Sequence, residues 1–354
     1  MKNRILSLLF ALLLVFSLSS CKDPEQPSQP GDPVDVRIYT LNGTTGFGIA
    51  KLMSDAKNGA YPSINYSIEI KTEASDVLAA LANGSVDIAA LPTNAASTIY
   101  NKTNGGVEIL AVNTLGCLYL TNTTGVKVNS IAELGGKTVY APAQNPTFIF
   151  TYICQQNGLT VITDGTPAAN EIYIDSTSYA QPAALRDAVA SGAVGLAVLP
   201  EPMVTIAVGK GAAASPAVSV SVDLDLTAVW DQIPGKAGTL VQGCIVVRRE
   251  FLQAHPEAVA SFLAAYEQSI SFLNTYPTEA AKLIYSLGIF KDPKQSEESN
   301  LAIIASAIPK CNVRYIAGAD MRTAVSTYLG ILAGINPQSI GGKVPAQDFY
   351  HIAA

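Results

Sequence analysis

Few residues of this 354-residue chain have the types and spacing that catalysis or metal binding requires. The only two histidines are His255 and His351, and no His-Glu-x-x-His pair is present, so neither a zinc site nor a histidine base is indicated. The chain also lacks a Gly-x-Ser-x-Gly motif and a phosphate-binding Gly-Lys-Ser/Thr loop. We therefore predict a protein with no catalytic residue, no metal and no cofactor.

The cysteines form no recognisable chemical motif. Four of them, Cys117, Cys154, Cys244 and Cys311, follow an N-terminal Cys21, and none belongs to a Cys-x-x-Cys pair, which excludes the common zinc and redox signatures. An exported chain could join them in disulfides. Each of the four also lies in an apolar segment, which favours small buried thiols.

Polar residues gather instead in loops that follow predicted strands and precede predicted helices. In open α/β sheets, ligands bind at the carboxyl ends of the strands, where helix N-termini offer free N–H donors. Each loop alone is better explained as ordinary helix capping, but five such loops from two similar halves favour a binding site. The predicted ligand-binding residues are Asn42, Gly43, Thr44, Thr45, Gly46, Phe47, Thr93, Asn94, Asn113, Thr114, Gln144, Asn145, Thr147 and Glu201.

The charge of these loops limits the ligand. They contain no lysine or arginine and a single acid, Glu201, so a strongly anionic ligand would depend on helix N-termini alone. This favours a neutral or zwitterionic ligand, or a flat ring stacked on Phe47, Phe148 or Trp230. Outside the loops no basic cluster is present, which disfavours nucleic-acid binding.

One stretch of the chain occurs twice. In residues 82–94 and again in residues 190–202, a helical run ends at a glycine, a short apolar strand follows, and a proline ends the strand before a new helix. The apolar strands are typical of a parallel sheet covered by helices on both faces. The likeness could arise between two ordinary α/β units, or it could reflect two similar α/β lobes facing a cleft.

The elements follow this plan along the chain, with βα units first, a similar set in the middle and helices from Glu250 onward. Since the last helices need a sheet to pack on, we expect them to return to the first lobe, so that two crossovers form a hinge. Predicted strands cover 36–41, 64–70, 86–91, 108–112, 117–121, 137–141, 171–175, 194–199, 218–226 and 239–247. The predicted lobes are 34–122 plus 222–354 for lobe 1 and 123–221 for lobe 2.

The N-terminus has the pattern of an exported lipoprotein. Residues 1–20 combine Lys2 and Arg4 with an apolar run too short to span a bilayer, which predicts a signal peptide, and Leu18-Ser-Ser-Cys21 predicts lipidation of Cys21. An uncleaved anchor or an ordinary signal with an incidental cysteine are the alternatives. Residues 21–35 are rich in proline and predict a flexible tether. No later apolar run is long enough to cross a membrane.

In the order of its motifs, the chain resembles substrate-binding lipoproteins of ABC importers of the nitrate/sulfonate/taurine type, which contain an SsuA/THI5-like domain. The matching segments are Leu41-Asn-Gly-Thr-Thr-Gly-Phe-Gly-Ile-Ala-Lys-Leu-Met53, Gly84-Ser-Val-Asp-Ile-Ala-Ala-Leu-Pro92, Ile131-Ala-Glu-Leu-Gly-Gly-Lys-Thr-Val139, Pro200-Glu-Pro202, residues 246–258 and residues 276–281. The resemblance implies a type 2 periplasmic-binding-protein fold, with two α/β lobes that close on a ligand. It also implies ligand groups from the loop 42–46, the loop after Leu91 and the loop before Phe148. Because the first loop departs from commoner versions, the ligand class does not carry over.

Two functions remain in view at this point. The first is a lipid-anchored solute-binding component of an ABC importer, a monomer at the periplasmic face or cell surface that passes its ligand to a permease with its ATPase. The alternative is an enzyme on the same fold, acting on a small metabolite of the menaquinone- or thiamine-precursor type. The predicted anchor at Cys21 and the lack of a convergent acid–base pair favour the solute-binding component. A surface adhesin or sensor would keep the anchor but need no closing cleft.

Overall fold

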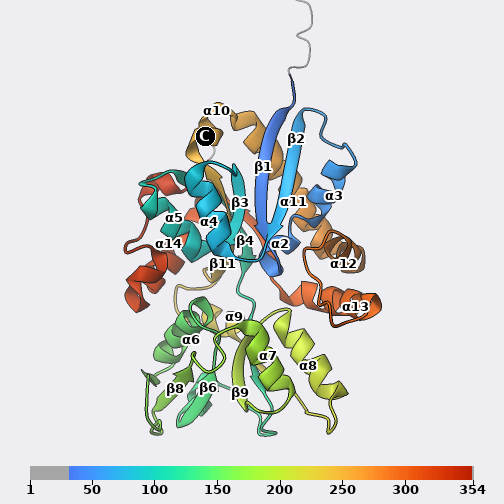
Figure 1. The fold of residues 1–354 in the computed structure, drawn as a ribbon. Helices are drawn as coiled ribbons and strands as arrows, with labels where there is room; N and C mark the ends of the chain where they lie inside the picture. The colour runs from blue at the N-terminus through green and yellow to red at the C-terminus, as the bar shows by residue number, and fades with distance from the viewer. Residues whose placement is uncertain (1–31, 353–354) are drawn as a thin grey trace, which may run out of the picture. The chain divides into compact units, whose positions relative to one another are not determined.

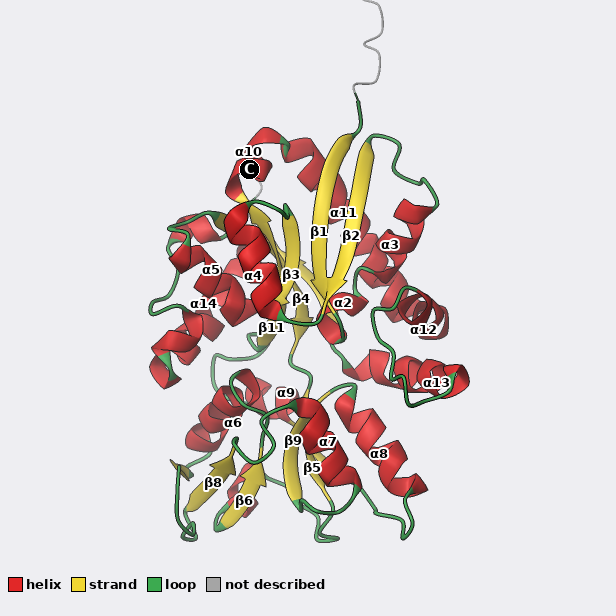
Figure 2. Cartoon of the chain, viewed as in Figure 1, coloured by secondary structure: helices red, strands yellow, loops and turns green. Residues whose placement is uncertain are grey.

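The computed structural model describes residues 32–352, in which the chain forms two six-stranded sheets that we call sheet A and sheet B (Figures 1 and 2). The predicted signal peptide, Cys21 and most of the predicted tether lie outside the described residues. Residues from Val34 to the C-terminus form one compact unit. None of the described helices is both long and apolar enough to cross a membrane.

Sheet A combines a parallel half with an antiparallel half. The first three strands of the chain are parallel, because each is followed by a helix that returns the chain to the same edge. The strand that enters from sheet B runs antiparallel to both of its neighbours. In spatial order the strands are β12 (Val313–Ala317), β4 (Val107–Leu115), β11 (Val241–Arg248), β3 (Ile88–Pro92), β1 (Val34–Leu41) and β2 (Ile64–Lys71).

Sheet B repeats this arrangement. Its order is β10 (Ser221–Asp225), β5 (Leu118–Asn122), β9 (Leu196–Pro200), β6 (Lys137–Tyr140), β8 (Glu171–Asp175) and β7 (Thr160–Ile162). The order β8-β6-β9-β5-β10 matches β2-β1-β3-β11-β4 of sheet A, and the fourth strand of each order, β5 or β11, is antiparallel to both of its neighbours. The two repeated strands, β3 and β9, occupy the same central place and are buried along their length up to the final proline. The repeated stretch therefore marks two similar α/β sheets.

Helices cover both faces of each sheet. In sheet A, α4, α5 and α14 pack on one face and α3, α11 and α12 on the other, so alternate residues of β3 enter two different cores (Figure 1). In sheet B, α6 and α9 cover one face and α7 and α8 the other. The helices are α2 (Thr44–Phe47), α3 (Ala50–Lys57), α4 (Ala74–Asn83), α5 (Thr93–Lys102), α6 (Asn145–Gln156), α7 (Pro182–Ala190), α8 (Met203–Ala213), α9 (Leu226–Asp231), α10 (Arg249–Ala254), α11 (Pro256–Thr275), α12 (Pro277–Ser286), α13 (Glu297–Ala307) and α14 (Gly318–Ile335), with 3-10 turns η1 (Ile131–Leu134), η2 (Ile308–Lys310), η3 (Pro337–Ile340) and η4 (Gln347–Phe349).

The chain passes between the sheets twice, at Gly116-Cys117 and over residues 232–240. The crossovers touch: a side chain on Gly116 would place its Cβ 2.3 Å from Thr227 Oγ1 and 2.4 Å from Leu240 Cδ2. Strand pairing differs from the predicted lobe boundaries, because β5 and β10 pair with each other in sheet B, whereas we had assigned both mainly to lobe 1. The local sequence of either strand suits either sheet, and only the long-range pairing decides between them.

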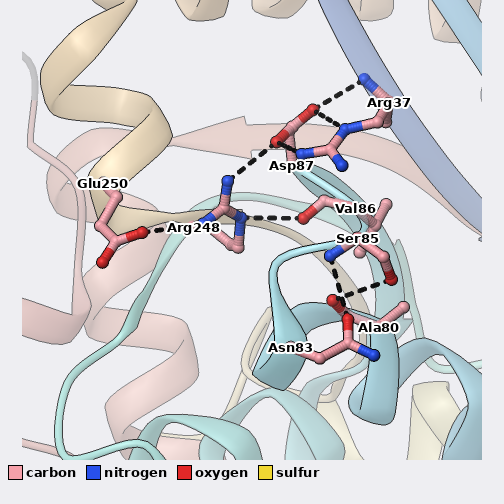
Figure 3. Close-up of polar contacts among 8 residues, drawn as sticks. All are labelled: Arg37, Ala80, Asn83, Ser85, Val86, Asp87, Arg248 and Glu250. Atoms are coloured by element: carbon pink, nitrogen blue, oxygen red, sulfur yellow. Dashed lines mark hydrogen bonds and ion pairs between the residues drawn. The ribbon is translucent and has the colours of Figure 1, made fainter.

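A buried carboxylate joins three neighbouring strands of sheet A at the edge where β3 begins (Figure 3). Asp87 accepts hydrogen bonds from Arg37 of β1 at Nε (2.9 Å), Nη2 (2.6 Å) and the backbone N (3.0 Å), and from Nη2 of Arg248 of β11 (3.1 Å). Arg248 also donates from Nε to the Val86 carbonyl (3.0 Å). The side chain of Asp87 is 2% exposed, whereas that of Arg37 is 44% exposed, so the carboxylate is the buried partner of this ion pair.

The lone tryptophan lies where helices of the two sheets meet. Trp230 of α9 is fully buried, with ring centroids 5.0 Å from Tyr152 of α6 and 6.2 Å from Tyr328 of α14. Its indole N–H donates to Thr239 Oγ1 (3.0 Å) and to the Lys236 carbonyl (3.1 Å) in the second crossover. One aromatic cluster thus connects both sheets and a crossover.

Candidate functional site

A cavity of about 620 Å³ lies at the carboxyl ends of strands from both sheets, and we call it the strand-end cavity. Its walls come from the starts of α4, α5 and α6 and from residues 336–339, which follow α14. Leu78 and Phe148 contribute apolar surface. The polar lining residues are Glu73, Ser75, Asn94, Thr98, Gln144, Asn336, Gln338 and Ser339.

Three helices begin at this cavity without a side-chain cap. The residues at the N-cap positions of α4, α5 and α6 are Glu73, Pro92 and Gln144, and none accepts a hydrogen bond from the first turn of its helix. The first N–H groups of a helix have no partner within the helix. The cavity is therefore a place where backbone donors are available to a ligand.

Gln144 has a strained backbone at the rim of the cavity. Its φ of 67° and ψ of −124° belong to a region that residues with a side chain rarely adopt. The loop around it is held by Thr147, whose hydroxyl donates to the Pro142 carbonyl (2.7 Å). Such strain persists only where the surrounding structure imposes it, and it is typical of residues that a site positions.

Two predicted site residues carry buried amide oxygens without a protein partner. Asn94 Oδ1 and Asn145 Oδ1 are shielded from solvent and accept no hydrogen bond from any residue in the described range 32–352. The orientation of Asn94 is set by Nδ2, which donates to the Ser339 carbonyl (3.2 Å). A buried acceptor without a partner is costly. Asn94 lines the strand-end cavity, so its oxygen is suited to a ligand that donates, whereas Asn145 lies outside the lining, beside Tyr328.

The first predicted loop does not line the strand-end cavity. Asn42 is exposed, Gly43 donates its backbone N–H to the Ile289 carbonyl (3.2 Å), and a Cβ at Gly46 would lie 2.1 Å from the Leu41 carbonyl oxygen. Burial raises the pKa of the Cys117 thiol in the first crossover to about 12, and a hydrogen bond from Thr44 acts in the opposite direction. Thr44 thus lies beside the crossover rather than in the cavity.

Several other predicted site residues have partners within the protein. Asn113 donates from Nδ2 to the Thr45 carbonyl and to Tyr266 Oη (both 3.0 Å), and its Oδ1 accepts from the Thr114 hydroxyl (3.1 Å). These bonds use the whole amide, so Asn113 holds the first loop against β4 rather than facing a ligand. Thr93 is also fully buried.

Two of the three rings expected to stack on a ligand are unavailable for it. Phe47 is fully buried against Phe290, at a centroid distance of 6.3 Å, and Trp230 is enclosed by the aromatic cluster. Both lie on helices whose apolar faces enter the core. Residue type alone cannot distinguish an aromatic ring in the core from one in a binding site. Phe148 is half-buried and lines the strand-end cavity.

Glu201 lies in a second cavity of about 680 Å³, lined by residues of α8, β10 and η2. Its carboxylate accepts from the backbone N (3.1 Å) and hydroxyl (3.0 Å) of Thr205, so it serves the first turn of α8. Burial raises the pKa of Glu201, and the Thr205 hydrogen bonds and the charge of Lys310 oppose this rise. Lys310 Nζ is 3.9 Å from Glu201 Oε1, and the Lys310 carbonyl accepts from Tyr119 Oη (2.9 Å). Lys310 therefore places a positive charge beside Glu201, although the predicted ligand-binding loops themselves contain no lysine or arginine.

The C-terminal segment 336–343, which we call the strap, was absent from the predicted site. It lies along one side of α5, where polar side chains recur at positions 94, 97, 98 and 101. Ser97 donates to the Ile340 carbonyl (2.8 Å), and Asn101 donates to the carbonyls of Ile340 (2.9 Å) and Lys343 (2.7 Å). Polar residues three and four positions apart lie on one face of a helix, and this pattern was the signal in the sequence that another chain segment could pack there.

The remaining reactive residue types do not gather in the described part of the chain. The four cysteines between residues 32 and 352 are buried free thiols, as the apolar segments around them indicated. Within the same range no group of three histidine, cysteine or acidic side chains could hold a metal ion.

Comparisons with known proteins identify the fold. No protein-family model matches the chain, and no curated protein matches its sequence. An ABC transporter structure from Parabacteroides distasonis superposes with a TM-score of 0.70 at 20% identity, covering 90% of this chain and 99% of that one. The periplasmic aliphatic sulphonate binding protein SsuA from Escherichia coli gives 0.65 at 14% identity, covering 91% and 94%.

A third similar structure is the alkanesulfonate-binding protein SsuA from Xanthomonas axonopodis pv. citri bound to MOPS, with a TM-score of 0.58 at 13% identity and coverage of 89% and 96%. These likenesses extend over nearly the whole of each chain and agree with the paired six-stranded sheets. They confirm the α/β fold class and the SsuA-like resemblance that the motif order indicated. The chain has the fold of the periplasmic solute-binding proteins of ABC importers.

Proposed function

We propose that this protein is the solute-binding component of an ABC importer and captures a small polar molecule in the strand-end cavity. The observation that carries the proposal is that one cavity is lined by three uncapped helix starts, two from sheet A and one from sheet B. A volume of about 620 Å³ is within the range of small-molecule sites. A ligand that contacts Asn94 and Gln144 together would join the two sheets.

Capture would proceed by movement of two lobes about the crossovers. The proposed lobes follow sheets A and B, and Gly116 with residues 232–240 would act as the hinge. The contacts of Lys310 with Glu201 and Tyr119 join η2 to sheet B, so an opening of the lobes would have to break them. A ligand stabilises the closed form only to the extent that it binds that form better than the open one.

A binding experiment tests this function. The mature chain without its lipidated Cys21, from residue 22 onward, contains the whole compact unit and can be screened by thermal shift against sulfonates, nitrate, pyrimidines, amino acids, sugars and small aromatics. We expect a hit whose affinity falls at least about tenfold in Asn94→Ala and in Gln144→Ala, because each removes a hydrogen-bonding group from the cavity.

The matched control is Asn65→Ala, an exposed asparagine on β2 that bonds only to Asp35. It should leave the affinity unchanged. Full affinity in both cavity variants would show that the strand-end cavity is not the site. Conversion of the bound molecule on prolonged incubation, followed by mass spectrometry, would favour the alternative of an enzyme on this fold.

The proposed location is the outer side of a membrane, attached through lipid on Cys21, with a permease and its ATPase as partners. The support is the sequence pattern before Cys21 and the proline-rich stretch after it. Expressed in a bacterium, the full chain should partition into detergent and incorporate labelled fatty acid, and Cys21→Ser should lose both properties. Label incorporated into Cys21→Ser to the same extent would contradict the proposed anchor.

A further inference from the structure

The strand-end cavity offers hydrogen-bond donors and acceptors together but no positive side chain. Of its polar lining residues, Asn94, Gln144, Asn336 and Gln338 are carboxamides, and each carboxamide both donates and accepts. The only charged lining residue is Glu73. A ligand that matches this set must itself donate and accept at several points.

Asn94 fixes one of these requirements. Because its Nδ2 already donates to the Ser339 carbonyl of the strap, the amide cannot turn over without losing that bond. Its Oδ1 therefore stays an acceptor, buried and unpartnered within residues 32–352. A ligand meets it only with an O–H or N–H group, which nitrate or an alkanesulfonate does not have.

Negative charge is already present at one of the three helix starts. Glu73 occupies the N-cap position of α4 and Asp76 lies in its first turn. At the start of α6, Pro146 has no backbone N–H to donate. An anion in the cavity would face Glu73 without a lysine or arginine to offset it, which a desolvated charge needs.

The remaining surface suits a ring with an apolar face. Phe148 on α6 and Leu78 on α4 line the cavity among the amides. Ring C–H groups of a saturated cyclic compound can lie on an aromatic face while its hydroxyl groups point outward to amide partners. Two neighbouring hydroxyl groups on such a ring can form hydrogen bonds with the oxygen and the nitrogen of one carboxamide.

We propose that the ligand is a neutral, polyhydroxylated ring compound such as a monosaccharide or cyclitol, and that Gln338 and Asn336 of the strap are ligand-contacting residues. Backbone N–H groups at the starts of α5 and α6 donate hydrogen bonds to the hydroxyl oxygens of the ligand, and Asn94 Oδ1 accepts a hydrogen bond from one of its hydroxyl groups. The strap thereby sets specificity from outside the strand-end loops. This inference rests on the proposed function and adds the chemical class of the solute.

The test is isothermal titration of the mature chain with two sets of probes. The neutral set is D-ribose, D-glucose and myo-inositol, and the anionic set is ethanesulfonate and nitrate, which have no O–H or N–H group. We expect binding from the neutral set only, weakened at least about tenfold by Gln338→Ala and by Phe148→Ala. The control is Gln347→Ala, an exposed glutamine of η4 that lines no part of the cavity, and its affinity should equal that of the wild type.

Two results would overturn the proposed ligand class without overturning the proposed function. Binding of an anionic probe, made tighter by Glu73→Gln, would show an anion site and would keep the solute-binding role. Absence of binding by all three neutral probes overturns the class whether or not an anion binds. A neutral ligand that binds equally well to wild type and Gln338→Ala would remove the strap from the site. The proposed function fails separately, if the broad screen yields no ligand sensitive to Asn94→Ala or Gln144→Ala.

Discussion

Replacing Asp87 with asparagine should lower the free energy of unfolding by about 3 kcal/mol, because it removes the negative charge between two arginines and puts a donating NH2 group where one oxygen accepts from Arg37. This figure is at the low end for breaking a buried ion pair, since the Arg37 side chain is 44% exposed and can be rehydrated. Urea denaturation of the two proteins at pH 7, followed by circular dichroism, measures the difference.

The effect should also depend on pH in a defined direction. Burial alone would raise the pKa of Asp87, but hydrogen bonds from Arg37 and Arg248 outweigh burial and hold the pKa below its usual value. A carboxyl group whose pKa is lowered by folding stabilises the protein above its unfolded pKa of about 3.9, and that contribution is lost as the pH falls through the folded value. The gap between Asp87→Asn and wild type should thus be constant near neutrality and shrink below about pH 4.

The control for this prediction is Asp35→Asn. Asp35 lies two residues before Arg37 on the same strand, is exposed, and accepts one hydrogen bond from Asn65. Its replacement should change the free energy of unfolding by less than about 0.5 kcal/mol. An Asp87→Asn protein as stable as Asp35→Asn would contradict a structural role for the buried ion pair.

Replacing Trp230 with alanine should lower the free energy of unfolding by about 4 kcal/mol, since the ring is fully buried and packs between helices of both sheets. The variant also frees the hydroxyl of Thr239 from its indole partner. Trp230→Phe should lose less, because most of the apolar contact with Tyr152 and Tyr328 is retained.

Guanidinium denaturation followed by far-ultraviolet circular dichroism measures this loss without depending on the tryptophan itself. Tyr276→Ala supplies the comparison, since that aromatic ring is 52% exposed at the end of α11 and should cost less than about 1 kcal/mol. A small loss in Trp230→Ala, similar to that in Tyr276→Ala, would mean that the aromatic cluster does not hold the two sheets together.

The sequence predicts best those features that depend on local pattern. Glycine after a helix and proline after a strand located β3 and β9, and the helices predicted from Glu250 onward include the long helix α11. The pattern predicted no strand at Val313–Ala317 and no helix at Leu226–Asp231, because both are short and take their conformation from packing. The first loop after β1 contains a short helix, α2, which ends at Phe47, and a second helix, α3, begins at Ala50.

Long-range partners were beyond a reading of local pattern. Nothing near Asp87 in the sequence points to Arg37 or Arg248, which are 50 and 161 residues away. The strap binds α5 through its own backbone carbonyls, and carbonyls leave no trace in residue types. Of the predicted site residues, the ones at helix starts 94 and 144 line the strand-end cavity, because a strand end followed by a helix start already specifies where a side chain lies.

The single tryptophan makes the unmodified protein its own optical probe. With only Trp230 in the chain, the indole fluorescence of the folded protein arises from one place, the contact between α9, α6 and α14. Emission from a buried indole shifts to longer wavelength when water reaches the ring. If the proposed movement of the lobes lets water reach this ring, the colour of the emission will report that movement without a dye, and stopped-flow mixing will give its rate.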